Sequence, residues 1–338
     1  GELASATKRD GLVRISASAW IPGHVLGPWR YTGTPNDGPN DVVPHEHRRE
    51  LRALKVFGAW TNLVDMKAGN TLDTVIEENG RSVVRHYLQD VGSTFGTGAN
   101  GPREYDEGWE LLFEPDLAKK RLVRLGFFFQ PWQTVEYVDN AAIGRFEGDE
   151  FDPLTWKPRV ATAAFLRARA DDNFWAARRV AAFTDDMIRS AVKTGGYSDP
   201  ASEALLVDVL IKRRQKIVNA YLPAINPLYD FALAANGALT FRNAAVETGV
   251  SQSPASGYRA QWLQFDNTTG QTRSLGAVST SRHTRLMPTA ALPDANGTFV
   301  KLQVSAAEPA PAEWLRPVDV YFTRTAGGWR LIGLDRLP

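Results

Sequence analysis

Alternating apolar and polar positions predict a β-hairpin in the first third of the chain. Residues 71–77 (TLDTVIE) and 81–89 (RSVVRHYLQ) are rich in β-branched and aromatic residues and flank the dipeptide Asn79-Gly80. Asn-Gly between two such runs is the strongest short-range signal of a two-residue hairpin turn. Counting back along an antiparallel ladder from that turn predicts that Asn70 and Asp90 are near neighbours at the open end.

Apolar residues at helical spacing predict two helical regions. The first covers residues 45–61, after a turn-rich linker at 35–44. Its basic side is typical of solvated surface and consists of Arg48, Arg49, Arg52 and Lys55. The second covers residues 162–222, where Ser198 and Asp199 are expected to cap a helix that begins at Pro200.

The last third of the chain has a strand pattern. Strands are expected at residues 258–265, 299–304, 318–323 and 329–334. Their spacing predicts a small antiparallel β-sandwich of immunoglobulin-like size. Trp262, Trp314 and Trp329 fit either the core of that sandwich, which we favour, or a carbohydrate-binding platform. A short strand pattern also begins at Leu12 and is followed by a connector.

These elements predict an α+β protein with three parts. Residues 1–44 form a strand and linker, residues 45–228 form a mostly helical lobe with the hairpin, and residues 229–338 form the sandwich. A chain of 338 residues is long enough for two ordinary domains or for one large domain with an appendage.

Two polar motifs flank the hairpin. Residues 65–70 (DMKAGN) have the form DxKxxN, and residues 90–92 (DVG) have the form DxG. Asn70 and Asp90 offer an amide oxygen and a carboxylate, which suit Mg²⁺ because that ion prefers hard oxygen ligands and keeps several waters. The structural alternative is that Asn70 is a turn residue and Asp90 an αL or capping residue.

The order and spacing of these motifs resemble the catalytic loop, hairpin and metal-binding DFG of the protein-kinase-like superfamily. The resemblance implies that Asp65 orients the accepting hydroxyl and that Lys67 neutralises the moving phosphoryl group. It also implies that Asn70 and Asp90 hold Mg²⁺ and that ATP is the donor. The catalytic residues are thus Asp65 and Lys67, and the metal ligands are Asn70 and Asp90.

Two departures place the resemblance among atypical kinases. Residues 62–64 (NLV) stand where a His-Arg dipeptide usually leads the loop, and Val91 replaces the phenylalanine of DFG. The pattern is closer to the spore-coat CotH-type, secreted casein-kinase-like and phosphoinositide-kinase-like branches. The helical lobe would then be a kinase-like C-lobe, and residues 10–31 would be the last strand of the nucleotide lobe and the hinge. We expect an upstream segment or another chain to complete that lobe.

Two functions stay open on this basis. The first is Mg-nucleotide-dependent phosphoryl transfer by an atypical kinase. The second is a catalytically silent kinase-like scaffold whose β-sandwich contacts a protein or glycan partner. The lost His-Arg lead favours the scaffold, and the paired motifs favour the enzyme.

Composition limits the partners. The chain has 39 basic and 38 acidic residues, so no global field attracts nucleic acid. Because it has no cysteine, disulfides and thiolate zinc sites are excluded. No apolar stretch is long enough to span a membrane. Residues 45–60 resemble an uncharacterised bacterial envelope family, which favours a periplasmic or extracellular protein over a cytoplasmic one.

Several further motifs have structural interpretations. His45-Glu46-His47 has no third metal ligand nearby, and the GxGxxG at residues 96–101 does not follow a strand. The doublets Asp171-Asp172 and Asp185-Asp186 are expected at the surface or at helix caps. The aromatic run Phe127-Phe128-Phe129 is expected in the core, within a segment of packed helices or of helix and strand.

Overall fold

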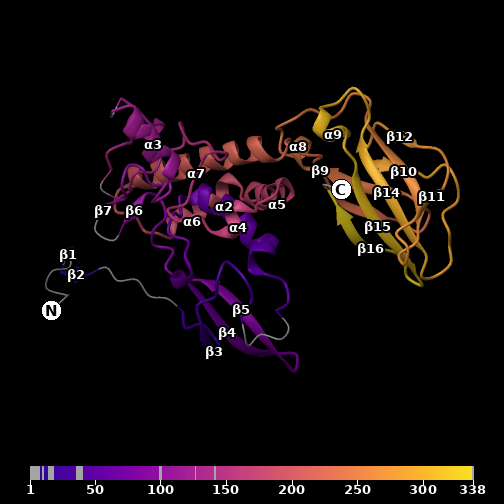
Figure 1. Cartoon of the computed structure of the whole chain (residues 1–338), viewed down its shortest axis with the longest axis horizontal. Coiled ribbons are helices and arrows are strands. Elements are labelled where there is room, and N and C mark those ends of the chain that lie inside the picture. Colours follow the sequence, from indigo (N-terminus) through magenta and orange to yellow (C-terminus); the bar gives the residue numbers. More distant parts are fainter. Residues whose placement is uncertain are drawn as a thin grey trace. The chain divides into compact units, whose positions relative to one another are not determined.

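The computed structural model describes residues 8–9, 11–13, 19–35, 41–98, 101–125, 127–140 and 142–336. The chain is an α+β protein with helices and antiparallel sheets, as the sequence predicts (Figure 1). It forms two compact units: residues 1–29 with 68–90, and residues 30–67 with 91–338. Parts of the predicted N-terminal strand and of the linker at 35–44 lie outside the described residues.

The first unit contains the predicted hairpin. Strands β3 (His24–Gly27), β4 (Thr71–Glu78) and β5 (Arg81–Leu88) form a sheet in the order β3-β4-β5. The register runs from Glu78 opposite Arg81 to Thr71 opposite Leu88, which confirms the ladder counted from the sequence. The same unit has two short paired strands, β1 (Lys8–Arg9) and β2 (Leu12–Val13).

The turn of this hairpin requires left-handed backbone. Asn79 has φ 52° and Gly80 has φ 72°, and a type I′ turn needs positive φ at both positions.

We expect Gly80→Val to lower the free energy of unfolding of this unit by about 1–2 kcal/mol, because a β-branched residue is strained there. Amide exchange of β4 and β5 measures the effect. Gly327→Ala is the control, since no positive φ constrains Gly327 in the turn between β15 and β16; equal effects in the two turns would contradict the prediction.

The second unit begins with a helical part. Its helices are η1 (His45–His47), α2 (Arg49–Thr61), α3 (Pro115–Val123), η3 (Pro131–Gln133), α4 (Ala163–Leu166), α5 (Ala170–Ala181), α6 (Asp185–Lys193) and α7 (Pro200–Tyr221). The predicted helix at 45–61 is interrupted, because Arg48 has extended backbone. The Asp199 carboxylate accepts a hydrogen bond from the Ala201 N–H at 3.0 Å, which confirms the predicted cap before Pro200.

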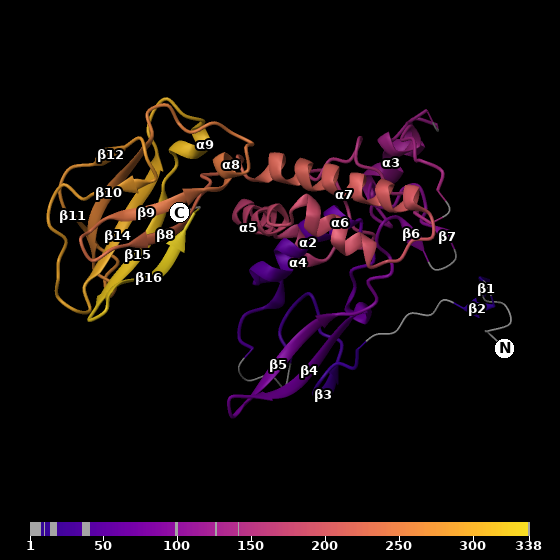
Figure 2. The ribbon, with the colours of Figure 1, turned by 180° about the vertical axis from the view of Figure 1, so that it is seen from behind.

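Helices α2, α5 and α7 pack around a common core (Figure 2). The buried side chains include Ala53, Val56, Trp60, Phe174, Val180, Leu206, Leu210 and Ile217. The Trp60 indole N–H donates to the Leu210 carbonyl at 2.9 Å and so fixes α2 against α7.

A buried arginine completes the end of α2. The Arg213 guanidinium donates to the Ala59 carbonyl at 2.5 Å and to the Trp60 carbonyl at 3.1 Å. These are carbonyls of the last helical turn, which lack partners within the helix. The guanidinium lies 3.6 Å from the ring centroid of Phe151. Burial lowers the pKa of Arg213, and nearby Glu147 opposes that shift.

The sequence indicated that the basic side of α2 is solvated surface. In the structure, Arg49 and Arg52 on this side instead bind buried carboxylates. The Arg52 guanidinium forms two hydrogen bonds to the Asp172 carboxylate, at 2.6 and 2.9 Å. Asp172 is fully buried and also accepts from the Arg169 N–H at 2.9 Å, at the start of α5. Asp171 is buried as well and accepts from Arg49 at 3.1 Å. The prediction that this doublet lies at the surface is therefore wrong, whereas the alternative of a helix cap is confirmed for Asp172, which accepts from the N-cap residue of α5. Arg52 from another helix compensates the buried charge.

The aromatic run at residues 127–129 is another correction. Phe127 is 81% exposed and Phe129 is 72% exposed, so neither belongs to the core. Of the described residues between 109 and 133, helical ones occur at α3 and η3, and none belongs to a named strand. An apolar run predicts burial only where another element packs on it, and α3 itself has no buried residue.

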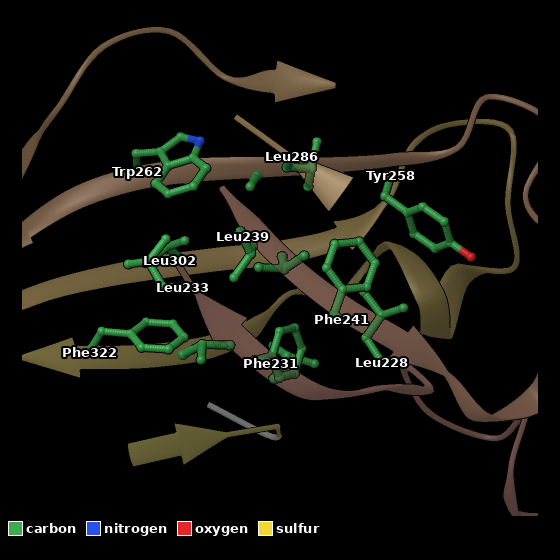
Figure 3. Packing of buried hydrophobic residues seen from close by; sticks show 14 of the residues in the cluster. Leu228, Phe231, Leu233, Leu239, Phe241, Tyr258, Trp262, Leu286, Leu302 and Phe322 are labelled. Atoms are coloured by element: carbon green, nitrogen blue, oxygen red, sulfur yellow. The ribbon is translucent and has the colours of Figure 1, made fainter. Parts of the chain in front are cut away.

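The last third of the chain contains two antiparallel sheets that share one core. The first consists of β8 (Leu228–Leu233), β9 (Leu239–Asn243) and β13 (Arg285–Leu286); the second of β10 (Tyr258–Phe265), β11 (Thr272–Ser274), β12 (Ser279–Ser281), β14 (Phe299–Ala306), β15 (Val318–Thr325) and β16 (Gly328–Asp335). Phe231 and Phe241 of the first sheet lie in one cluster with Tyr258 and Trp262 of the second (Figure 3). The alternating Val318, Val320 and Phe322 are buried, as predicted.

The segment between α7 and β8 is held by hydrogen bonds. The Asn226 side-chain amide donates to the Val304 carbonyl at 3.1 Å and to the Arg316 carbonyl at 2.8 Å. The Trp314 indole, on the short helix α9 (Ala312–Leu315), donates to the Pro223 carbonyl at 3.1 Å. No helix within the described part of the chain has the length and apolar character needed to cross a bilayer.

Candidate functional site

The loop that carries Asp65 is anchored by the end of α2. Asn62 ends the helix in left-handed backbone, with φ 52°, and its side-chain oxygen accepts a hydrogen bond from the Trp156 indole at 2.8 Å. Leu63 and Val64 are buried, and Val64 accepts from the Arg159 N–H at 2.9 Å. The Asn-Leu-Val sequence therefore has a packing role.

Asp65 and Lys67 form an ion pair at the end of this loop. The Lys67 ammonium lies 2.9 Å from the Asp65 carboxylate. The Asp65 side chain is 26% exposed and the Lys67 side chain 55% exposed, whereas Met66 between them is buried. An ion pair this exposed contributes roughly 0–1 kcal/mol. Both polar groups are thus held on the solvent side of the loop by the buried methionine, and both reach solvent.

Asn70 and Asp90 lie at the open end of the hairpin. Asn70 closes the short helix η2 (Ala68–Asn70) and is buried, and its carbonyl accepts from the Gln89 N–H at 3.0 Å. That bond continues the ladder by one pair beyond Thr71 and Leu88. Asp90 follows directly, is exposed and has φ 52°. This left-handed backbone of Asp90 agrees with the alternative that it is an αL residue.

The four predicted residues fall into two pairs. Asp65 and Lys67 belong to the unit that contains residues 30–67, and Asn70 and Asp90 belong to the unit that contains residues 68–90. Asp65 and Lys67 form an ion pair in the loop after α2. Asn70 and Asp90 both lie at the open end of the β4–β5 hairpin. Lys67 and Asn70 are three residues apart in the sequence.

Asn70 and Asp90 carry the kinds of oxygen atom that suit Mg²⁺. One carboxylate and one amide oxygen are hard donors, and Mg²⁺ commonly takes its other ligands from water and substrate phosphates. No group of three histidine, aspartate or glutamate side chains gathers as a metal site among the residues that the structure describes. In that part of the chain, water or phosphate would therefore have to supply the remaining ligands of a metal ion.

The other motifs have structural roles. The His45 ring contacts the Arg30 carbonyl at 2.5 Å and the Asp41 carboxylate at 2.7 Å, so both ring nitrogens are engaged. In the GxGxxG motif, part of which lies outside the described residues, a Cβ at Gly96 would meet the Arg145 carbonyl at 2.1 Å. Glycine at position 96 thus allows close backbone packing.

The polar cavity beside Asn62, at the end of α2, was not predicted from the sequence. Its volume is about 20 Å³, and it lies between Asn62, Glu107, Trp156 and Arg213. Burial raises the pKa of Glu107, and the charges of Arg103 and Arg159 oppose that shift. A cavity of this size has room for about one water molecule.

Comparisons with known proteins gave no match: no family model, no curated protein and no solved structure matches this chain. The chemistry of the site consequently rests on its own residues.

Proposed function

We propose that the protein is an atypical kinase-like phosphotransferase that binds ATP with Mg²⁺. The register of the β4–β5 hairpin carries this proposal. One hydrogen-bonded pair beyond the ladder, Asn70 lies opposite Gln89, and Asp90 directly follows Gln89, so an amide and a carboxylate residue both lie at the open end of the hairpin. The helices α2 to α7 would form the kinase-like C-lobe, and the two sheets of residues 228–335 the predicted β-sandwich.

Each polar residue has a distinct task in this proposal. Asp65 accepts a hydrogen bond from the acceptor hydroxyl and so orients it for attack. Lys67 is paired with Asp65 at 2.9 Å, and its ammonium neutralises charge on the transferred group. Asn70 and Asp90 hold the metal ion. When bound, Mg²⁺ supplies neutralisation of the phosphate charges.

Binding of the adenine and ribose needs a surface in addition to these four side chains. In the proposal, an upstream segment or another chain supplies the glycine-rich strands and lysine of the nucleotide lobe. The donor set at the hairpin supports this division, because it addresses metal and phosphate and has no apolar base pocket of its own.

The second candidate is a silent kinase-like scaffold whose β-sandwich binds a protein or glycan partner. Strand β16 favours it, because β16 ends the second sheet and exposes apolar side chains. Leu331, Ile332 and Leu334 are 43%, 43% and 40% exposed. A strand at a sheet edge can pair with a strand of a partner. Trp262 and Trp314 are buried, which removes them from any glycan platform.

Thermal unfolding with nucleotide distinguishes the two functions. We expect ATP with Mg²⁺, at about 100 times its Kd, to stabilise the protein by about 2.7 kcal/mol, because ligand binds the folded state alone. Mg²⁺ alone and ATP with EDTA are the controls and should give a much smaller shift. Equal midpoints in all four conditions, including no ligand, would support the scaffold.

A further inference from the structure

A cavity of about 450 Å³ lies in the β part of the chain, separate from the proposed nucleotide site. It is formed by the turn at residues 235–237, the segment 287–294 and the hairpin of β15 and β16. Its volume is in the range of small-molecule sites. The walls combine polar groups with a set of apolar side chains, which includes Met287, Pro288, Leu292 and Trp329.

Arg324 is the cationic side chain of the cavity lining. Arg324 on β15 pairs across the ladder with Trp329 on β16, and its guanidinium carbon lies 5.6 Å from the indole centroid. The Arg324 Nη1 atom is buried and has no hydrogen-bond partner. Within the described chain, Arg324 takes part in none of the ion pairs found at 4.0 Å or less. A buried donor of a charged group that lacks a partner is costly.

The composition of the lining selects the chemistry of a ligand. Asp294 is the acidic residue of the lining and is exposed, so water screens its charge. A guanidinium binds a carboxylate through two parallel hydrogen bonds. Sulfate and phosphate have no apolar part with which to cover Met287, Leu292 and Trp329. These apolar side chains instead match a ligand with an apolar body.

We propose that this cavity binds an organic carboxylate with an apolar body. The carboxylate accepts hydrogen bonds from the part of the Arg324 guanidinium that lines the cavity. The body of the ligand packs against the Trp329 indole and against Pro288 and Leu292. This site is independent of the hairpin chemistry, so either can fail without the other.

The test uses 3-phenylpropionate as the probe and calorimetry on the full chain. We expect a Kd on the order of 1 mM, as suits a ligand of this size. The matched amide, 3-phenylpropanamide, should bind at least about tenfold more weakly, because it lacks the charge that Arg324 recognises. Sodium sulfate should not compete. Saturable binding of the amide or sulfate with the same Kd would overturn the proposal, as would absence of binding by the carboxylate.

Two variants locate the site. Arg324→Gln should weaken 3-phenylpropionate binding at least about tenfold, since a neutral amide replaces the guanidinium. Arg330→Gln, an exposed arginine on β16 that does not line the cavity, should leave the Kd unchanged. Equal loss in both variants, or no loss in Arg324→Gln, contradicts the assignment. If Arg324→Gln does not fold, the comparison of carboxylate and amide on the unaltered chain still decides.

Discussion

Replacing Asp90 by alanine is expected to abolish Mg²⁺-dependent binding of ATP and to lower phosphoryl transfer by several orders of magnitude. Asp90 is the carboxylate of the proposed metal pair, and the amide of Asn70 carries no charge with which to hold a dication by itself. In phosphoryl transfer the protein mainly positions groups and neutralises charge, so loss of the metal removes most of the catalysis. Calorimetry with ATP and Mg²⁺ measures the binding.

The matched control for this variant is Glu77→Ala. Glu77 is an exposed carboxylate at the turn end of the same hairpin, where its partner is the Ser82 hydroxyl at 2.5 Å. We expect it to bind ATP with Mg²⁺ as the unaltered chain does. Protection of the β4 and β5 amides from exchange shows that the hairpin is intact in both variants. If Asp90→Ala binds ATP with Mg²⁺ as the unaltered chain does, and its hairpin is intact, the metal assignment is contradicted.

Replacing Asp172 by asparagine is expected to lower the free energy of unfolding by about 3–5 kcal/mol at neutral pH. The Asp172 side chain is fully buried and its partner Arg52 is 11% exposed, so the variant leaves a largely buried guanidinium without its counter-ion. This pair joins α2 to α5 and so supports the helix that precedes the Asp65 loop. Urea unfolding followed by circular dichroism measures the change.

The contribution of Asp172 has a defined pH dependence. Burial alone would raise its pKa, but the Arg52 and Arg169 hydrogen bonds outweigh burial and hold the pKa below the ordinary value of 3.8. Folding therefore favours the ionised carboxylate. The stabilisation is present above pH 3.8 and is lost as the pH falls through the lower pKa of the folded state. We expect the difference in the free energy of unfolding between the unaltered chain and Asp172→Asn to become smaller as the pH falls below 3.8.

Asp186→Asn is the control for that stability measurement. Its side chain is 97% exposed and its contact to Arg189 is 3.9 Å, so the expected change is within about 0.5 kcal/mol. A loss in Asp172→Asn no larger than in this control, or a difference that grows as the pH falls, would contradict the role of the buried pair.

Local signals made the hairpin predictable. Asn79 and Gly80 adopt positive φ at low cost, and the β-branched residues on either side determine the strands, so the register followed by counting. The cap at Asp199 and the alternation at Val318, Val320 and Phe322 are equally local. Each depends on residues a few positions apart, which is the range over which backbone preference acts without tertiary contacts.

Features that join distant residues could not be read from the sequence. Arg52 and Asp172 are 120 residues apart, and Arg213 is 154 residues from the Ala59 carbonyl that it binds. An arginine on a helix has the same local pattern whether its partner is water or a buried carboxylate. The Arg324 cavity likewise depends on two loops and a hairpin that meet only in the folded chain. The Arg52–Asp172 pair, the Arg213 contact and the Arg324 cavity all depend on tertiary packing.

The most direct test of the central claim is paramagnetic broadening by Mn²⁺, which takes the oxygen ligands that suit Mg²⁺. Substoichiometric Mn²⁺ with ATP is added to the ¹⁵N-labelled protein, and the amide signals of the hairpin are followed. The proposal predicts that the signals of Asn70, Gln89 and Asp90 broaden first, while those of the Asn79-Gly80 turn broaden last. Sharp Asn70 and Asp90 signals beside broadened ones elsewhere would contradict it.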